Sequence, residues 1–317
     1  MKLLDISTII DKPSMFFIGV TTHNSFINKV FEHWLAILNK NIELIGVNLE
    51  LNCDPKEYQL VLDRIERNPF VLGALVTTHK VRIFNHCKEY FNNLPKTCHD
   101  FKEIGCIYKE GPNLQGEVTD LYSVKDALKA LLENKVNDFK SDIYLLGCGG
   151  AGLALAYVIL SNEIPNYKRL IISETDPNRC LEIEAILEKY NQSKKLQIIN
   201  THKQSSESIV SGLEEGSLIV NATGLGKDKK GSPIQENTKY PSSSILWDFN
   251  YRGELEFLTN NLKLKDKYNL QIEDGWIYFI NGWSQVLKRV TGSHDIFKHF
   301  NEFKSIADSK REKTNYR

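Results

Sequence analysis

The segment Asp142–Leu160, DIYLLGCGGAGLALAYVIL, decides the fold of this chain. An apolar run, Ile143–Leu146, leads directly into a glycine-rich turn, and the small and apolar run Ala151–Leu160 follows. This order predicts a strand, a tight turn and a helix whose first free N–H groups can bind an anion. Because many strand-to-helix turns use glycine only for packing, the pattern needs support from its context. The glycines of the turn are Gly147, Gly149, Gly150 and Gly152.

The composition is that of a soluble, folded protein. The 317 residues are enough for two ordinary domains, each with its own core. Lysine and arginine together number 40, as do aspartate and glutamate, so no net field favours a nucleic acid or an anionic membrane as partner. No apolar run approaches the roughly 18 residues that span a bilayer, and the first residues lack a signal-peptide pattern. We expect a cytoplasmic protein that is a monomer or a homodimer.

The cysteines and histidines argue against metal and disulfide chemistry. The six cysteines show no C-x-x-C pairing, which fits free thiols in a reducing compartment. The eight histidines show neither H-x-x-x-H nor H-E-x-x-H spacing, so we expect no metal site. His23 and His79 lie in polar loops, and we assign neither a role, because a lone histidine in such a loop is usually only a loop residue.

Strands and helices are expected to alternate in both halves of the chain, which predicts an α/β fold with mostly parallel sheets. The first half offers strands at Met15–Val20, Ile42–Leu49 and Phe70–Val76 and a hairpin within Ile104–Asp120. After the opening strand, the second half offers Leu170–Ser173, Leu196–Asn200, Leu218–Asn221 and Ile245–Phe249. That cadence is typical of a doubly wound, Rossmann-type NAD(P)-binding domain.

We therefore expect two domains with an active-site cleft between them. Residues 1–121 would form an α/β domain that binds substrate and carries catalytic groups, and residues 122–274 the Rossmann-like domain. Residues 275–317 would form a helical segment that packs back on the first domain. Polar runs follow two strands of the first domain, at Thr21–Asn28 and Thr77–Lys80, where open α/β sheets place their ligands.

Five short motifs, in the same order along most of the chain, resemble those of the shikimate and quinate dehydrogenase family. Gly73–Lys80 (GALVTTHK) is similar to G-x-N-V-T-x-P-x-K, but it is one residue shorter and lacks the asparagine and the proline. Gly116–Asp120 (GEVTD) is similar to G-x-N-T-D. The others are Val220–Thr223 (VNAT, like I-N-A-T), Asp248–Tyr251 (DFNY, like D-x-x-Y) and a helix from Gly275 that ends in T-G at Gly292. The chain resembles a divergent, shikimate dehydrogenase-like member.

The resemblance implies that Lys80 and Asp120 are the catalytic pair. Hydride transfer between an alcohol and a nicotinamide needs a group that takes or gives the hydroxyl proton. A lysine in a partly dry site can serve, because burial lowers its pKa and a nearby carboxylate orients it.

The residues that would recognise the substrate depart from the family pattern. Thr22 and Asn24 fall where the family has an S-x-S pair for the substrate carboxylate. Tyr108 replaces a substrate-binding asparagine, and Gly282 replaces a glutamine of the last helix. Because sites built on hydrogen bonds reject analogues strongly, we expect a polar, carboxylated hydroxy or keto substrate other than shikimate. Thr77 and Tyr251 remain as hydroxyl groups on the substrate side.

The expected cofactor is NAD, with NADP left open. Family members that use NADP typically have N-R-T after the second strand of the cofactor domain, whereas this chain has Glu174 there. A carboxylate accepts hydrogen bonds from the ribose and repels a 2′-phosphate, although Arg179 could still bind one. The cofactor-binding residues implied are Gly147, Gly149, Gly150, Ala151, Glu174, Asn221, Ala222 and Thr223.

These features predict an NAD(P)-dependent dehydrogenase that acts on a CH–OH group. The alternative is a regulatory relative that binds a nucleotide or ligand without turnover, but such a protein has no need of Lys80 and Asp120. A methyltransferase with a glycine loop is a third possibility, and the lysine and the Val220–Thr223 match weigh against it.

Overall fold

The chain folds into two units in a computed structural model that describes residues 1–4, 9–133, 136–192, 194–227 and 229–312. The first unit comprises Met1–Thr119 and Gly282–Glu312, and the second comprises Asp120–Asn281. The boundaries expected from the sequence were 121 and 274. The helix that begins at Trp276 starts in the second unit and continues into the first.

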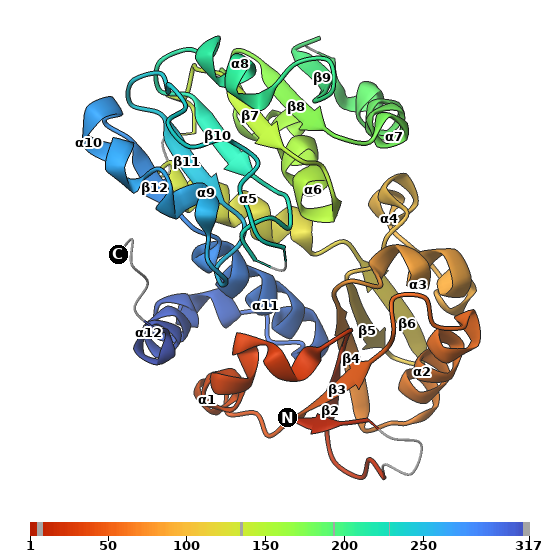
Figure 1. The fold of residues 1–317 in the computed structure, drawn as a ribbon. Coiled ribbons are helices and arrows are strands. Elements are labelled where there is room, and N and C mark those ends of the chain that lie inside the picture. The colour runs from red at the N-terminus through yellow and green to blue at the C-terminus, as the bar shows by residue number, and fades with distance from the viewer. Residues whose placement is uncertain (5–8, 134–135, 193, 228, 313–317) are drawn as a thin grey trace. The chain divides into compact units, whose positions relative to one another are not determined.

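The first unit is built on a six-stranded sheet in the order β1-β3-β2-β4-β5-β6 (Figure 1). The first four strands in this order run parallel, and β5 and β6 form the expected antiparallel hairpin. The strands are β1 (Lys2–Leu3), β2 (Ser14–Gly19), β3 (Glu43–Asn48), β4 (Val71–Val76), β5 (Cys106–Glu110) and β6 (Asn113–Glu117). The expected strands Met15–Val20, Ile42–Leu49 and Phe70–Val76 are confirmed to within one residue at each end.

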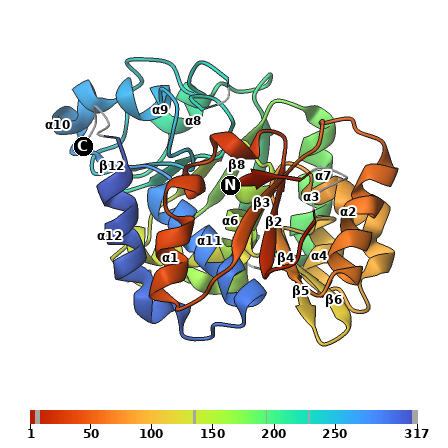
Figure 2. The same cartoon turned by 90° about the horizontal axis from the view of Figure 1, so that it is seen from below.

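Helices cover both faces of this sheet. On one face lie α1 (Phe31–Ile37) and α12 (Phe300–Lys310) (Figure 2). Trp34 of α1 stacks on Phe303 of α12, with 4.9 Å between the ring centroids. On the other lie α2 (Pro55–Arg67) and α3 (Lys80–Cys87), followed by the short α4 (Lys96–Phe101). Helix α2 starts at Pro55, where Asp54 accepts a hydrogen bond from Lys56 N and proline occupies the first turn.

The second unit has an all-parallel, six-stranded sheet in the order β12-β11-β10-β7-β8-β9 (Figure 1). Numbered within the unit, this is the order 6-5-4-1-2-3 of dinucleotide-binding folds, and the order reverses between β7 and β10. The strands are β7 (Ile143–Leu146), β8 (Leu170–Glu174), β9 (Leu196–Asn200), β10 (Leu218–Asn221), β11 (Ile245–Asp248) and β12 (Gln271–Glu273). The doubly wound fold class is confirmed.

Helices precede, connect and follow these strands. They are α5 (Asp120–Leu131), α6 (Gly150–Val158), α7 (Pro177–Leu187), α8 (Ser206–Ser211), α9 (Glu256–Thr259), α10 (Lys265–Tyr268) and the start of α11 (Trp276–Thr291). Strands β7 and β10 form the centre of the sheet, and all eight of their residues are at most 1% exposed. Strand β12 was not expected, because three residues with the sequence QIE carry too little apolar pattern to predict a strand. Within the described residues, none of the helices combines the length and apolarity needed to cross a bilayer.

Candidate active site

The turn after β7 has the geometry that its glycines predict. Gly147 has φ +77°, and a Cβ there would lie 2.7 Å from Thr223 Cγ2. A Cβ on Gly152 would lie 2.8 Å from the carbonyl oxygen of Gly147, so this glycine lets α6 pack closely on the turn. Gly149 differs from both, since a Cβ there would meet no atom of the described chain within 4 Å. Two glycines are therefore required by the fold, whereas Gly149 leaves open space beside the start of α6.

Glu174 borders this turn from the end of β8. Its Oε2 accepts a hydrogen bond from Cys148 N at 3.2 Å, and its Oε1 accepts one from Thr175 N at 2.7 Å. Arg179 of α7 approaches the same place, because its Nη2 donates to Cys148 O at 2.9 Å. A carboxylate and a guanidinium group thus bind the backbone N–H and C=O of the same residue, Cys148. Burial raises the pKa of the Cys148 thiol to about 12, so Cys148 is a neutral packing residue here.

The loops after β10 and β11 are joined by buried amides. Asn221 Oδ1 accepts bonds from Thr223 N at 3.0 Å and Thr223 Oγ1 at 2.6 Å, and its Nδ2 donates to Asp248 Oδ2 at 3.1 Å. Asn250 Nδ2 donates to Thr223 O at 3.2 Å and Leu225 O at 3.0 Å. Asn221 is fully buried, so its side chain shapes the loop from within. Ala222 and Thr223 are half-buried and lie beside the glycine turn.

Asp248 is the acid at the centre of this network. Burial raises its pKa to about 7, and the nearby Asp274 adds to the rise. Hydrogen bonds from Asn250 N and Asn221 Nδ2 oppose the shift, since they stabilise the carboxylate. Its charge therefore changes close to neutral pH.

Tyr251 follows this network and is held by aromatic rings of α11. Its ring centroid lies 4.4 Å from that of Phe279 and 5.8 Å from that of Trp276. Gly275 makes this packing possible, because a Cβ there would collide with the backbone of Phe249. Tyr251 is half-buried.

In the first unit, two expected substrate residues lie at the C-terminal edge of the sheet. A Cβ on Gly19, at the end of β2, would lie 2.7 Å from Thr77 Oγ1 and 3.2 Å from Thr22 Cγ2. Thr77 Oγ1 donates to Ile18 O at 3.0 Å, and Thr22 Oγ1 donates to Asn48 Oδ1 at 2.7 Å. Both hydroxyl protons are therefore engaged inside the unit. Asn24, the other residue at the S-x-S positions, is exposed.

Lys80 is the first residue of α3 and lies beside the start of β5. A Cβ on Gly105 would lie 3.6 Å from Lys80 Nζ, so the missing side chain of Gly105 makes room for the ammonium group. Ile104 N donates to Lys80 O at 3.2 Å, which ties the helix start to the hairpin. Lys80 is half-buried. Asp120 begins α5 three residues after β6 ends, and it is also half-buried.

His79 has a structural role that the sequence did not reveal. The ring is fully buried, with Nε2 3.1 Å from Leu49 O and Nδ1 2.9 Å from Tyr58 Oη. A carbonyl oxygen only accepts, so Nε2 carries the proton and Nδ1 accepts from Tyr58. Burial lowers the pKa of His79, which keeps the ring neutral. These two bonds anchor His79, the residue before Lys80, to Leu49 just after β3 and to Tyr58 of α2. His23, by contrast, is exposed.

Tyr108 and Gly282 stand where the family has a substrate-binding asparagine and glutamine, and their surroundings differ from that pattern. Tyr108 lies within β5, opposite Gly73 and Gln115, and burial raises the pKa of its phenol. Gly282 has no side chain to offer, and one helical turn later the buried Gln285 accepts from Arg289 Nη1 at 2.8 Å. Arg289 also donates to Glu117. The half-buried Arg289–Glu117 pair includes none of the expected site residues.

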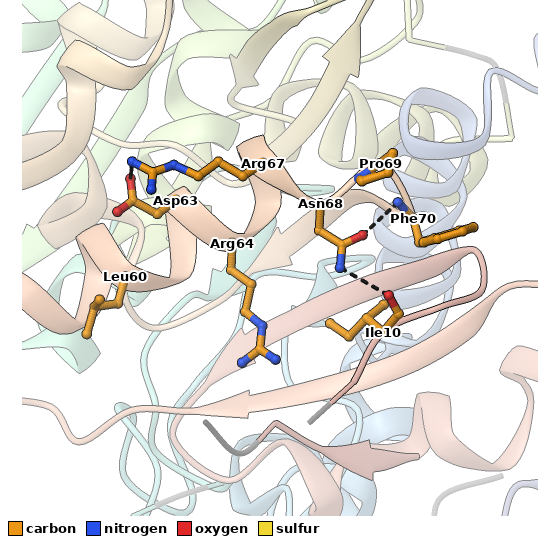
Figure 3. Close-up of a pocket in the computed structure, with 8 residues that line it drawn as sticks. All are labelled: Ile10, Leu60, Asp63, Arg64, Arg67, Asn68, Pro69 and Phe70. Atoms are coloured by element: carbon orange, nitrogen blue, oxygen red, sulfur yellow. Dashed lines mark hydrogen bonds and ion pairs between the residues drawn. The ribbon is translucent and has the colours of Figure 1, made fainter. Parts of the chain in front are cut away.

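One surface cavity of the first unit lies away from these residues (Figure 3). Its volume is about 590 Å³, and it is lined by Ile10, Leu60, Asp63, Arg64, Arg67, Asn68, Pro69 and Phe70. Asn68 holds its wall by bonds to Ile10 O and Phe70 N. Phe70 precedes β4, so the cavity opens at the N-terminal edge of the parallel strands, opposite Thr77. Across the described residues, no three His, Cys, Asp or Glu side chains gather in a metal-binding group.

The reversal of strand order and the glycine turn define the second unit as a Rossmann-type α/β domain. Comparisons with known proteins agree. The NADP(+) shikimate dehydrogenase of Lactococcus lactis subsp. cremoris is 21% identical over 220 residues, which are 67% of this chain and 62% of the relative. The chain thus matches less than two thirds of that relative's length. No family model matches the chain.

Solved structures show the same fold. A quinate dehydrogenase from Corynebacterium glutamicum in complex with NAD has a TM-score of 0.74 and 15% identity, over 93% of this chain and 99% of that chain. A shikimate 5-dehydrogenase from Thermus thermophilus in complex with NADP(H) and shikimate has a TM-score of 0.67 and 18% identity, over 94% and 99%. The resemblance to the shikimate and quinate dehydrogenase family is therefore confirmed, and the chain shares that family's two-unit fold.

Proposed function

We propose that this protein is an NAD(P)-dependent dehydrogenase of the shikimate dehydrogenase type. It acts on the hydroxyl or keto group of a polar, carboxylated small molecule. The glycine turn carries the proposal, because Gly149 leaves open space at the N-terminus of α6 while Gly147 and Gly152 are required for packing. In this assignment the second unit binds the cofactor, and the first unit binds the substrate.

The turn fits the pyrophosphate of a dinucleotide. Its backbone N–H groups at the start of α6 favour an anion, and the space beside Gly149 allows close approach. Gly150 and Ala151 form the first turn of that helix. The half-buried Ala222 and Thr223 would line the next part of the cofactor site, held there by Asn221. When bound, the nicotinamide supplies or accepts the hydride.

Glu174 favours NAD over NADP. Its carboxylate already points at the glycine turn through Cys148 N, and a ribose hydroxyl there could donate to it. A 2′-phosphate would meet its negative charge at short range. Arg179 is the group that would offset this repulsion, because it reaches the same residue of the turn. We therefore propose NAD as the preferred cofactor, with NADP as a weaker substitute.

Lys80 and Asp120 are proposed as the proton-transfer pair. Lys80 would take the hydroxyl proton during oxidation of the alcohol and return it during reduction of the ketone. The local structure supports this role, because His79, which directly precedes Lys80, is held by two hydrogen bonds and Gly105 makes room for Lys80 Nζ. Asp120 would orient the ammonium group and stabilise its charge.

The substrate shell supports a molecule other than shikimate. Thr22 and Thr77 donate their hydroxyl protons to Asn48 and Ile18, so each can only accept from a ligand unless it rearranges. Asn24 and Tyr251 are the remaining expected contacts, and both are at least partly exposed. The family's asparagine and glutamine positions carry Tyr108 and Gly282, which offer different hydrogen-bonding chemistry.

Cofactor titration followed by a substrate screen tests the proposal. Energy transfer from tryptophan to the reduced nicotinamide should report binding of NADH, and more weakly of NADPH, since the chain has four tryptophans. A panel of hydroxy acids with NAD, followed at the NADH absorbance band, should then identify a substrate. If neither dinucleotide binds, the proposal fails. If NADH binds and no acid turns over, the non-catalytic regulatory relative is the better description.

A further inference from the structure

Asn48 is the last residue of β3 and lies at the C-terminal edge of the first unit's sheet. No sequence motif indicates it. It pairs in register with Gly19 at the end of β2, so it lies on the same sheet edge as Thr22 and Thr77. Its side chain is exposed, whereas Thr22 beside it is only 2% exposed. The exposed amide of Asn48 is therefore held by a buried threonine.

The orientation of this amide is fixed by Thr22. Thr22 N lies 3.0 Å from Asn48 Oδ1, and Thr22 Oγ1 lies 2.7 Å from the same atom. A backbone N–H can only donate, so the atom that faces it must be the carboxamide oxygen. A flipped amide would place two donors against each other and would lose the bond to Thr22 N. The NH₂ group of Asn48 therefore points away from Thr22.

Two glycines make this arrangement possible. A Cβ on Gly46, two residues earlier on the same strand face, would collide with Thr22 Oγ1. A Cβ on Gly19 would crowd Thr22 Cγ2 at 3.2 Å. The residue after Asn48 is also fixed, because Leu49 N donates to Gly19 O at 2.9 Å and Leu49 O accepts from His79. Asn48 is thus built rigidly onto the turn that presents Lys80.

The only group of the Asn48 side chain left for a ligand is the NH₂ group, which can only donate hydrogen bonds. Its oxygen is occupied by Thr22, and no partner for Nδ2 is found among the residues that the structure describes. A carboxylate is the complementary group, because it accepts hydrogen bonds and cannot donate them. The hydroxyls of Thr22 and Thr77 have both donated inward, so they do not supply this contact.

We propose that Asn48 Nδ2 donates a hydrogen bond to the carboxylate of the substrate, and that Thr22 is the residue that orients it. This inference rests on the proposed function, because it assigns a contact in the same site. It also revises the expected role of Thr22 from a direct ligand to a positioning residue.

The substitution Asn48→Asp tests the contact without removing the support. Aspartate keeps an oxygen towards Thr22 and replaces the outward NH₂ with a negatively charged oxygen. Asn52→Asp is the matched control, since Asn52 is an exposed asparagine four residues later and the charge change is the same. The probes are shikimate, quinate and 3,4-dihydroxybenzoate, with 3,4-dihydroxybenzamide as the neutral counterpart of the last.

Binding is measured by calorimetry, and the side-chain NH₂ signals of Asn48 are followed in ¹⁵N–¹H spectra, assigned by their loss in Asn48→Asp. We expect at least one acid to shift these signals. Its affinity should fall about 10- to 100-fold in Asn48→Asp and stay within about twofold in Asn52→Asp, with unchanged melting temperatures. The benzamide should bind more weakly than the acid.

Three results would overturn the proposal: no acid moves the Asn48 signals, Asn48→Asp binds an acid as tightly as the wild type, or the benzamide binds as tightly as the benzoate. These outcomes differ from failure of the proposed function. Acid binding at Asn48 without any nicotinamide binding would keep the contact and remove the dehydrogenase. Turnover of an acid that Asn48→Asp leaves unimpaired would keep the dehydrogenase and remove the contact.

Discussion

The two units differ in how their candidate sites are built. In the second unit, the glycine turn and the loops after β10 and β11 are shaped by backbone contacts and buried amides, centred on Gly147, Asn221 and Asp248. In the first unit, the polar residues at the C-terminal edge of the sheet are single side chains, such as Thr22 and Asn48, that bond to each other. A cofactor stays the same while substrates vary. A substrate site built from single side chains, as in the first unit, therefore diverges more readily than a cofactor site shaped by the backbone.

A position that carries a ligand in the family can hold a residue with other bonding partners in this chain. Thr22 falls at a position where the family has a carboxylate ligand, yet its hydroxyl proton is donated to Asn48. By contrast, Glu174 lies at the end of β8 and against the glycine turn, as the pattern predicts.

Removal of the proposed proton-transfer group should have the largest effect. Lys80→Ala should lower kcat about 10²- to 10⁴-fold, the usual contribution of a general acid or base. The affinity for NADH should stay the same, because Lys80 belongs to the first unit and the cofactor is assigned to the second. Lys88→Ala, which removes an exposed lysine just after α3, is the control. Undiminished activity in Lys80→Ala would exclude this mechanism.

Asp248 should make the stability of the protein depend on pH. Its pKa is raised from 3.8 to about 7 by folding, so its contribution is fully present below pH 3.8 and is lost as the pH rises through 7. Since each pKa unit corresponds to about 1.4 kcal/mol, the total change is on the order of 4 kcal/mol.

Urea unfolding of the wild type and of Asp248→Asn, from pH 5 to pH 8, measures this change. The difference in unfolding free energy between them should shift against the wild type as the pH rises, because the asparagine does not titrate. A difference that stays constant across this range would show that Asp248 does not titrate there.

Glu174 should set the preference between the two dinucleotides. Glu174→Ala removes the negative charge beside Cys148 N and leaves Arg179 at the turn, so the NADH/NADPH affinity ratio should move about 10- to 100-fold towards NADPH. Glu184→Ala removes an exposed acid from α7 and should leave the ratio nearly unchanged. Separate calorimetric titrations give both affinities. If the ratio does not move, Glu174 lies away from the ribose.

Thr22→Val should have the smallest effect. It removes one of the two bonds that orient Asn48 and keeps the other, from Thr22 N. Binding of the acid probes should weaken about three- to tenfold, since one hydrogen bond is worth about 1 kcal/mol. Thr22→Ser keeps the hydroxyl and should bind like the wild type. A loss in Thr22→Val as large as that in Asn48→Asp would mean that Thr22 contacts the substrate itself.

Much of the fold could be predicted from the sequence, because long apolar strands and glycine turns are local signals. Strand β12 was missed since its three residues are short and polar at a sheet edge. The position of Glu174 at the end of β8 could be predicted because the strand pattern fixes it, whereas its role in cofactor binding stays a prediction.

Other site features depend on contacts between distant parts of the chain. His79 looks like a loop residue until the fold brings Tyr58 and Leu49, 21 and 30 residues away, to its two nitrogens. Asn48 belongs to no motif, and its orientation depends on Thr22, 26 residues before it. No pattern within either segment could reveal these bonds.

Binding of NADH to Gly149→Ala is the sharpest test of whether the glycine turn binds a dinucleotide. Gly149 has φ −71°, ψ −164°, and a Cβ would meet nothing within 4 Å, so alanine should leave the melting temperature unchanged. Gly152→Ala is the contrasting variant and should destabilise the second unit, because its Cβ would press on Gly147 O. We predict that NADH binds the wild type saturably and binds Gly149→Ala about tenfold more weakly or worse, since the methyl group fills the space for the pyrophosphate. Equal affinity for NADH in both proteins, or no binding to either, would exclude the glycine turn as the cofactor site.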